Sequence, residues 1–211
     1  MRVTKFEHAC FTLEKDGKLL VVDPGAYTTD LGAPENVVAI IITHEHPDHF
    51  DVTAIGALIA HNPEAVVVTH ESITRQLGKV IPHQSVEAGS TITSGPFELA
   101  FYGGTHATIS ESMPPLPNLG VMVDQKLYYP GDSFFVPDRA VEVLALPASA
   151  PWCKISEVMQ FLNEIKPRLA FPTHDAILSD VGKQLVDNML SNNTAQQMGI
   201  TYQRIVEPTD I

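Results

Sequence analysis

The chain has 211 residues, of which 44% are hydrophobic and 18% charged, a balance typical of a globular protein rather than a disordered one. Its 25 acidic and 13 basic residues give a formal net charge of −12, the wrong sign for a nucleic-acid-binding surface. The length fits one domain with a substantial core, so we expect a single domain over residues 1–211.

The start of the chain and its cysteines favour a reducing compartment. The first residues contain no hydrophobic signal region, and no apolar run approaches the length of a membrane span. Cys10 and Cys153 are too few for a disulfide framework and lack the close spacing of a thiolate zinc site. We therefore expect a cytoplasmic protein that binds neither membranes nor nucleic acid.

The first half of the chain predicts strands followed by helices. Asp16 and Gly17 are a strong hairpin signal. The apolar, β-branched run at 37–42 is typical of a buried strand, and Asp51 is a predicted N-cap. In chain order we expect strands over 3–6, 10–14, 18–22 and 37–42, a helix over 52–60, a strand over 65–69, a helix over 71–77 and short β segments between 85 and 102.

The second half repeats this alternation. An amphipathic helix is predicted to end before Pro167, and Asp124 marks a turn between two strands. The predicted elements are strands over 119–123, 125–129 and 141–146, a helix over 155–165, a strand over 169–171 and a further helix through 181–189. Two successive strand-rich halves, each followed by helix, indicate sheets enclosed between helical layers.

The most informative segment is residues 43–49, Thr-His-Glu-His-Pro-Asp-His, which follows the predicted strand at 37–42. It places His44, His46, Asp48 and His49 within six positions, where the side chains would crowd one another unless something bound them. Imidazole nitrogen and carboxylate oxygen suit zinc, iron or manganese. The segment therefore predicts a site for one or two divalent cations at a sheet edge.

Three further candidate ligands each follow a predicted strand with Gly or Pro close by. They are His106, Asp132 and His174. A strand fixes the direction of the ligand that follows it, and glycine allows close backbone approach. These residues have the positions that a rigid metal site on strand ends requires.

The HxHxDH motif at 44–49, followed by His106, Asp132 and His174, resembles the binuclear site of the metallo-β-lactamase superfamily in its hydrolase form. The resemblance covers nearly the whole chain. The stretch Glu-His-Ala-Cys-Phe at 7–11 is most similar to the branch that contains ascorbate-6-phosphate lactonase-like proteins. The resemblance implies a four-layer αββα sandwich with the metals at one edge of the β layers.

The same resemblance implies a role for each site residue. One metal would be held by three histidines and the second by a carboxylate and two histidines, with one aspartate bridging them. The first set is His44, His46 and His106, the second is Asp48, His49 and His174, and the bridge is Asp132. Asp23 would orient a liganding imidazole from behind, and His8 is either a similar supporting group or a core histidine.

The expected activity follows from the charge of the two cations. A metal pair about 3.5–4 Å apart lowers the pKa of a shared water to roughly 7. The bridged hydroxide would attack a carbonyl carbon or a phosphorus atom. The prediction is a metal-dependent hydrolase of a small ester, lactone or phosphodiester, with Asp48 as a candidate proton carrier and two zinc ions, or manganese or iron, as cofactors.

Two alternatives stay open at this point. Persulfide dioxygenase-like proteins keep the same histidines, so iron-dependent oxygen or sulfur chemistry is one. The flavodiiron pattern has Glu where this chain has His46, which argues against that version. The other is a non-catalytic binding module stabilised by metal.

The expected partner is a small-molecule substrate, and an oligomer is compatible with the sequence. Specificity would depend on the loops at 26–36, 107–118 and 147–154. Trp152 and Phe134 are candidate pocket residues. His70, Arg139, Lys154 and Arg168 are candidate substrate contacts for which a surface or helix-entry role is favoured.

Overall fold

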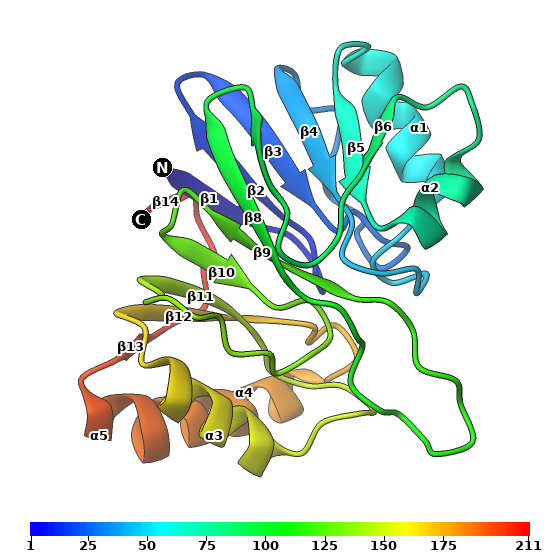
Figure 1. Cartoon of the computed structure of the whole chain (residues 1–211). Helices are drawn as coiled ribbons and strands as arrows, with labels where there is room; N and C mark the ends of the chain where they lie inside the picture. Colours follow the sequence, from blue (N-terminus) through cyan, green and yellow to red (C-terminus); the bar gives the residue numbers. More distant parts are fainter.

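The computed structural model describes the whole chain apart from the side chains of residues 193 and 194. Two seven-stranded sheets lie face to face, and helices cover the outer face of each (Figure 1). The predicted four-layer αββα architecture is confirmed. No helix in the described part of the chain is long and apolar enough to cross a membrane.

The first sheet has the order β14-β1-β2-β3-β4-β5-β6. β1 to β3 pair antiparallel, whereas β3 to β6 run parallel. Helices α1 and α2 lie on its outer face (Figure 1). The bounds are β1 Arg2–Lys5, β2 Phe11–Lys15, β3 Lys18–Val22, β4 Val37–Ile41, α1 Val52–His61, β5 Val66–Thr69, α2 Glu71–Leu77, β6 His83–Ser85 and β14 Thr209–Asp210.

The second sheet has the order β13-β12-β11-β10-β9-β8-β7. β7 to β10 pair antiparallel, whereas β10 to β13 run parallel. The later helices lie on its outer face (Figure 1). The bounds are β7 Thr91–Ser94, β8 Phe97–Gly103, β9 Leu119–Val123, β10 Leu127–Tyr129, β11 Val143–Pro147, α3 Ile155–Ile165, β12 Leu169–Thr173, α4 Asp180–Leu190, the π-helix η1 Ser191–Ala195, α5 Gln196–Met198 and β13 Thr201–Tyr202.

Both faces of the central strands are buried, which explains their continuous apolar runs. In β3, Leu20 and Val22 point into the core between the sheets, and Val21 points toward α1 and α2. In β4, Ile41 points inward and Ile40 outward. This alternation follows the two-residue period of a strand, and each fully buried side chain of this size stabilises the fold by about 1.5–3 kcal/mol.

Local signals decided several boundaries as predicted. Asp16 and Gly17 both have positive φ, 51° and 71°, which the tight turn between β2 and β3 requires. The Asp51 side chain accepts a hydrogen bond from Thr53 N at 2.8 Å and caps α1. Helix α3 ends at Ile165, before Pro167, with Lys166 in the left-handed region.

Other boundaries differ from prediction. β6, β13 and β14 have only two or three residues, too few to show a pattern, and β6 starts at His83, before the predicted β segments between 85 and 102. β12 continues through Pro172. Ala170 O accepts from Gln203 N on the side of β13, so the backbone nitrogen of Pro172, two residues later, points to the same side. The pairing with β13 has ended at that position, so the N–H that proline lacks is not needed by a neighbouring strand.

Candidate metal centre

Eight side chains converge in two clusters at the ends of strands from both sheets. In each cluster, one candidate ligand atom per residue lies within 4.8 Å of the others. All seven predicted ligands are brought together, and His8 joins them from the turn between β1 and β2. The first cluster is His44, His46, His106 and Asp132, and the second cluster is His8, Asp48, His49 and His174.

The carboxylate of Asp132 lies between the two clusters. Its Oδ1 is 3.3 Å from Nε2 of His49, and its Oδ2 is 3.0 Å from Nε2 of His174. The same Oδ2 is 3.3 Å from Nε2 of His106 in the first cluster. One side chain therefore reaches both clusters, as a bridging ligand must.

The backbone around Asp132 is held by a specific clamp. Asp132 N donates to Asn118 Oδ1 at 2.9 Å, and Asn118 Nδ2 donates to Pro130 O at 2.9 Å. Gly131 has a φ of 62°, and a Cβ there would lie 2.3 Å from Asn118 Oδ1. Only glycine allows this close approach, so the Pro-Gly-Asp sequence is explained by the clamp.

A second glycine, Gly25, packs closely against the backbone of the 44–49 segment. A Cβ on Gly25 would lie 1.9 Å from the carbonyl oxygen of Asp48. The loop that follows β3 therefore runs directly against the backbone of Asp48 and His49. This packing holds the second cluster against the end of β3.

Hydrogen bonds decide which ring nitrogens face the first cluster. Thr43 Oγ1 donates to Asp23 Oδ2 at 2.7 Å, so it must accept from Nδ1 of His44 at 3.1 Å. His106 Nδ1 donates to Ala107 O at 2.5 Å. Nε2 of both rings is left with a lone pair, and Nδ1 of His46 lies 3.1 Å from Nε2 of His44. Nε2 of His44 and His106 and Nδ1 of His46 form one face of the site.

The second cluster is fixed in the same way by more distant partners. His49 Nδ1 donates to Asp23 Oδ2 at 2.7 Å, and His174 Nδ1 donates to Ser149 O at 2.7 Å. Asp23 itself is fully buried and accepts from Thr43 N at 2.8 Å. Asp23 thus makes the contact expected of a residue that orients a liganding imidazole.

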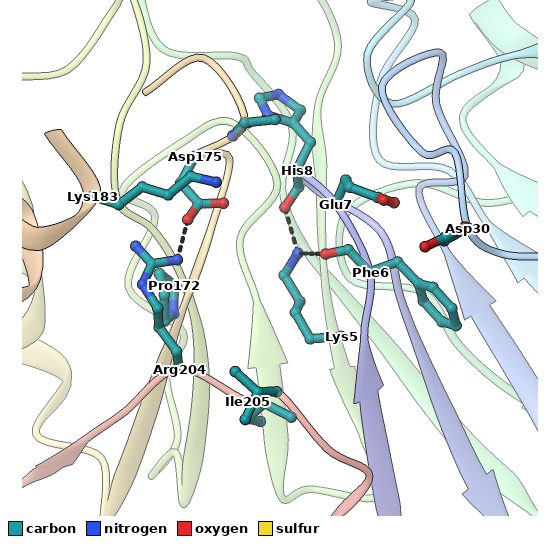
Figure 2. A pocket seen from close by; sticks show the side chains of 12 residues that line it. Lys5, Phe6, Glu7, His8, Asp30, Pro172, Asp175, Lys183, Arg204 and Ile205 are labelled. Carbon is teal, nitrogen blue, oxygen red and sulfur yellow. Dashed lines mark hydrogen bonds and ion pairs between the residues drawn. The ribbon is translucent and has the colours of Figure 1, made fainter. Parts of the chain in front are cut away.

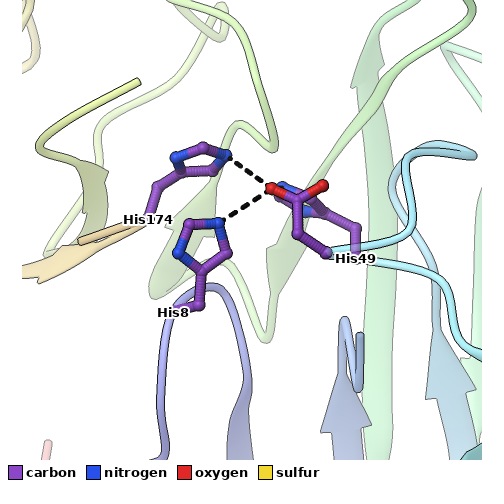
Figure 3. A group of neighbouring side chains, drawn as sticks. His8, His49 and His174 are labelled. Carbon is purple, nitrogen blue, oxygen red and sulfur yellow. Dashed lines mark hydrogen bonds and ion pairs between the residues drawn. The ribbon is translucent and has the colours of Figure 1, made fainter. Parts of the chain in front are cut away.

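His8 contacts Asp48 through a defined tautomer. Its Nδ1 accepts from Ala176 N at 3.3 Å, so the proton lies on Nε2, which donates to Asp48 Oδ2 at 2.9 Å. Figure 3 shows His8 and His174 directed at the same carboxylate. A protonated Nε2 has no lone pair for a metal, so His8 supports Asp48 although it lies within ligand distance of the cluster.

Several polar atoms of the clusters are buried without a hydrogen-bond partner. Among the described residues there are six such side-chain atoms, and four of them belong to the clusters. An unsatisfied buried polar group costs about 1–3 kcal/mol. These orphaned atoms, three imidazole nitrogens and one carboxylate oxygen, suit divalent cations. They are Nε2 of His49, His106 and His174, and Oδ1 of Asp132.

The charges agree with a cation site. Burial and the neighbouring His49 hold the pKa of His44 well below its usual value, which keeps the imidazole neutral and able to bind metal. Burial opposes ionisation of Asp132, but His49, His106 and His174 outweigh it and hold the pKa of that carboxyl well below its usual range. Burial lowers the pKa of His174, but the nearby carboxylates of Asp132 and Asp48, 3.0 and 3.3 Å from its Nε2, raise it overall to about 9. In metal-free protein, protons in the second cluster take the place of a cation.

The other candidate residues have structural roles. His70 caps α2, and its ring accepts from Ser72 N at 3.2 Å. Arg168 forms an ion pair with Glu142 at 3.1 Å. It precedes the first residue of β12, whereas His174 follows the last, so Arg168 lies at the end of the strand away from the clusters. Nε of Arg139 lies 3.8 Å from Oδ1 of the adjacent Asp138, and Lys154 is the N-cap residue of α3.

Sequence reasoning missed two contacts at the site. The Trp152 indole, predicted as a pocket wall, donates to Asp132 Oδ2 at 2.7 Å. The carbonyl of Ser149 orients His174. Both lie in the 147–154 loop that was predicted to affect specificity, but no residue pattern indicates that a backbone carbonyl or an indole N–H will meet a site residue.

Two cavities flank the clusters. One of about 340 Å³ lies between His46, His106 and the loop at 107–116. The other, of about 470 Å³, is lined by charged groups that include Lys5 and Arg204. Figure 2 shows the ring of His8 turned away from this second cavity, while its carbonyl accepts from Lys5 Nζ at 2.6 Å. His8 lines the second cavity and also contacts Asp48 of the second cluster through its ring.

Comparison with known proteins gives consistent matches. Protein Rv0786c of Mycobacterium tuberculosis is 35% identical over 199 residues, covering 92% of this chain and 93% of that protein. A UPF0173 metal-dependent hydrolase of Bacillus mycoides is 31% identical over 152 residues, 65% of each chain. The structure of Igni18, a metallo hydrolase from Ignicoccus hospitalis, aligns with a TM-score of 0.75 at 18% identity over 99% of this chain and 97% of that one.

The metallo-beta-lactamase fold protein YhfI of Bacillus subtilis aligns with a TM-score of 0.74 at 14% identity, over 99% of both chains. At such identities the two structures support the fold alone. Residues 2–174 match the family model described as the beta-lactamase superfamily domain. Because that match covers most of the chain and includes both clusters, the protein belongs to the metallo-β-lactamase superfamily.

Proposed function

We propose that the protein is a hydrolase that depends on two divalent cations, with zinc as the preferred metal. The observation that carries the proposal is the sharing of one carboxylate, Asp132, between two clusters whose inward atoms are buried without partners. The first cation is assigned to His44, His46 and His106, and the second to Asp48, His49 and His174, with Asp132 bridging.

When bound, a pair of divalent cations supplies Lewis acidity and lowers the pKa of water to roughly 7. The protein supplies the orientation of the ligands. Asp23 and the carbonyl of Ser149 hold the rings of His49 and His174, and His8 aligns the carboxylate of Asp48. Ligands held in this way need no rearrangement during a reaction.

The proton role of Asp48 stays a prediction. Oδ2 accepts from His8 at 2.9 Å and lies 3.3 Å from Nε2 of His174, so proton transfer would fall to Oδ1. Burial opposes ionisation of this carboxyl, but the nearby His174 and the hydrogen bond from His8 hold its pKa well below the usual range. An acid of this strength suits ligation better than proton delivery.

The reaction class that we favour is hydrolysis of a small ester or lactone, with phosphodiester hydrolysis as the alternative. The support is the resemblance of residues 7–11 to the lactonase-like branch, together with the role of His8 from that stretch at Asp48. We propose that the protein acts in the cytoplasm on a small molecule, and the formal charge of −12 disfavours a nucleic-acid substrate.

The test combines elemental analysis with an activity panel. We expect two equivalents of zinc per chain, hydrolysis of aryl esters or lactones, complete loss of activity after chelation and recovery when the metal is returned. Iron, with visible absorbance and oxygen consumption, would support the dioxygenase-like alternative instead. Undiminished hydrolysis by fully metal-free protein would refute the proposal.

A further inference from the structure

The loop between β8 and β9 is fixed at both ends to the frame of the metal centre. Gly104 N donates to Asn118 O at 2.9 Å, and His106 N donates to Leu116 O at 2.8 Å. Ala107 N donates to the carbonyl of Asp132 at 2.8 Å. The loop is therefore closed at its base by backbone hydrogen bonds, as compact surface loops are. The cavity under it has a fixed position beside the first cluster.

The lining of this cavity is mainly apolar. Its volume of about 340 Å³ falls within the range of small-molecule pockets, about 300–1,000 Å³. Ile109 and Met113 are 37% and 48% exposed, so part of their apolar surface is available to a ligand. Adjacent prolines restrict the backbone of the same wall. The apolar lining residues are Ala107, Ile109, Met113, Pro114, Pro115 and Leu116.

Charge in the cavity has one sign. Glu111 is the one charged group among the described lining residues apart from the two site histidines. Lys5, Lys183 and Arg204 line the other cavity (Figure 2). A second anionic group on a substrate would therefore meet a carboxylate and no cation, which disfavours its binding.

We propose that the substrate carries an uncharged, apolar group beside its scissile bond and that the cavity at 107–116 binds this group. The inference rests on the proposed hydrolase function and specifies its substrate class as an ester or lactone with a neutral alkyl or aryl substituent. The proposal excludes phosphorylated lactones as substrates, because no lysine or arginine in the described structure lines the cavity to bind a phosphate group.

A matched pair of carboxylates tests the cavity. Octanoate and octanedioate share a carboxylate head, which binds to a metal centre, but differ in the charge at the far end of the tail. The probe is the fluorescence of Trp152, the one tryptophan of the chain, whose ring centre lies 6.0 Å from that of His106. For zinc-loaded protein we expect octanoate to bind at least tenfold more tightly than acetate or octanedioate.

Charge-reversal variants locate the effect. Glu111→Lys should strengthen octanedioate binding at least fivefold because it places a cation in the cavity. Glu64→Lys makes the same charge change on an exposed residue just before β5, at the end of that strand away from the clusters, and should alter neither ligand. Equal affinity of the unmodified protein for octanoate and octanedioate would overturn the proposal, as would an octanoate affinity no higher than that for acetate.

Hydrolysis of p-nitrophenyl acetate and octanoate separates this proposal from the proposed function. Selective octanoate binding without hydrolysis of any ester or lactone would contradict the hydrolase function and leave the cavity assignment standing. Hydrolysis with the same kcat/KM for both esters, and for an ester with a terminal carboxylate on its tail, would contradict the cavity assignment alone.

Discussion

The two clusters share Asp132 but are held in different ways. In the first cluster, the ring of His44 bonds to the preceding residue, Thr43, and the ring of His106 bonds to the carbonyl of the residue after it. In the second cluster, the partners of His49 and His174 lie 26 and 25 residues away in the chain. Local sequence therefore orients the first cluster, whereas the packing of both sheets orients the second.

His8 shows this dependence most clearly. Its ring joins Asp48, 40 residues away, to the backbone of Ala176, 168 residues away. One imidazole thus connects the first hairpin to the segment that follows β12. We expect the second cluster to be the more sensitive of the two to changes in residues that bind no metal.

The largest effect is expected where the two clusters meet. Asp132→Ala removes the carboxylate that lies against His49, His106 and His174, so both metal equivalents should be lost and activity should fall to that of metal-free protein. Elemental analysis and ester hydrolysis measure the two effects. Asp138→Ala, on an exposed residue, is the control. Retention of two equivalents by Asp132→Ala would contradict the shared-ligand arrangement.

Removal of a ligand from the first cluster alone should have the next largest effect. His46→Ala should lower bound metal to one equivalent, because the second cluster keeps all its ligands. Activity should be abolished, because the proposed reaction needs both cations. His61→Ala is the matched control, since that ring is exposed and bonds only to Ala57 O of its own helix. Normal turnover by His46→Ala would show that the site assignment is wrong.

An orienting residue of the second cluster should matter less than a ligand. In Asp23→Asn an amide N–H can replace the acceptor for His49 Nδ1, so affinity for the second cation should fall about 10–100-fold. Among the side chains that the structure describes, the first cluster contacts Asp23 only through Thr43, so affinity for the first cation should fall less. Chelator competition resolves the two affinities. Asp30→Asn, on an exposed loop, should change neither. Equal weakening of both sites would remove the distinction between the clusters.

The smallest effect concerns pH in metal-free protein. The pKa of His174, about 9 when folded, exceeds its unfolded value of about 6.5, so the stability it contributes is complete below pH 6.5 and is lost as the pH rises through 9. The free energy of unfolding in urea should fall by about 1.5 kcal/mol between pH 6.5 and 8. Metal-loaded protein should change less, because the cation replaces the proton. A rise in metal-free stability over this range would contradict the assignment.

Much of the fold could be predicted because its signals are local. Asp16-Gly17 determines a turn through backbone conformation, and Asp51 caps a helix that begins at the next residue. The two-residue strands β13 and β14 could not be predicted, because pairing with a neighbouring strand defines them rather than their own composition. The same holds for β6, whose exposed side chains carry no apolar pattern.

For the candidate site, the sequence alone determined which side chains could bind metal. Residues 44–49 follow a buried strand, and the chemistry of imidazole and carboxylate does not depend on distant parts of the chain. Only the tertiary structure decided which nitrogen of His49 and His174 faces the site, that His8 supports Asp48, and that Trp152 bonds to Asp132. Those outcomes depend on atoms brought together by the packing of two sheets, and no short segment encodes that packing.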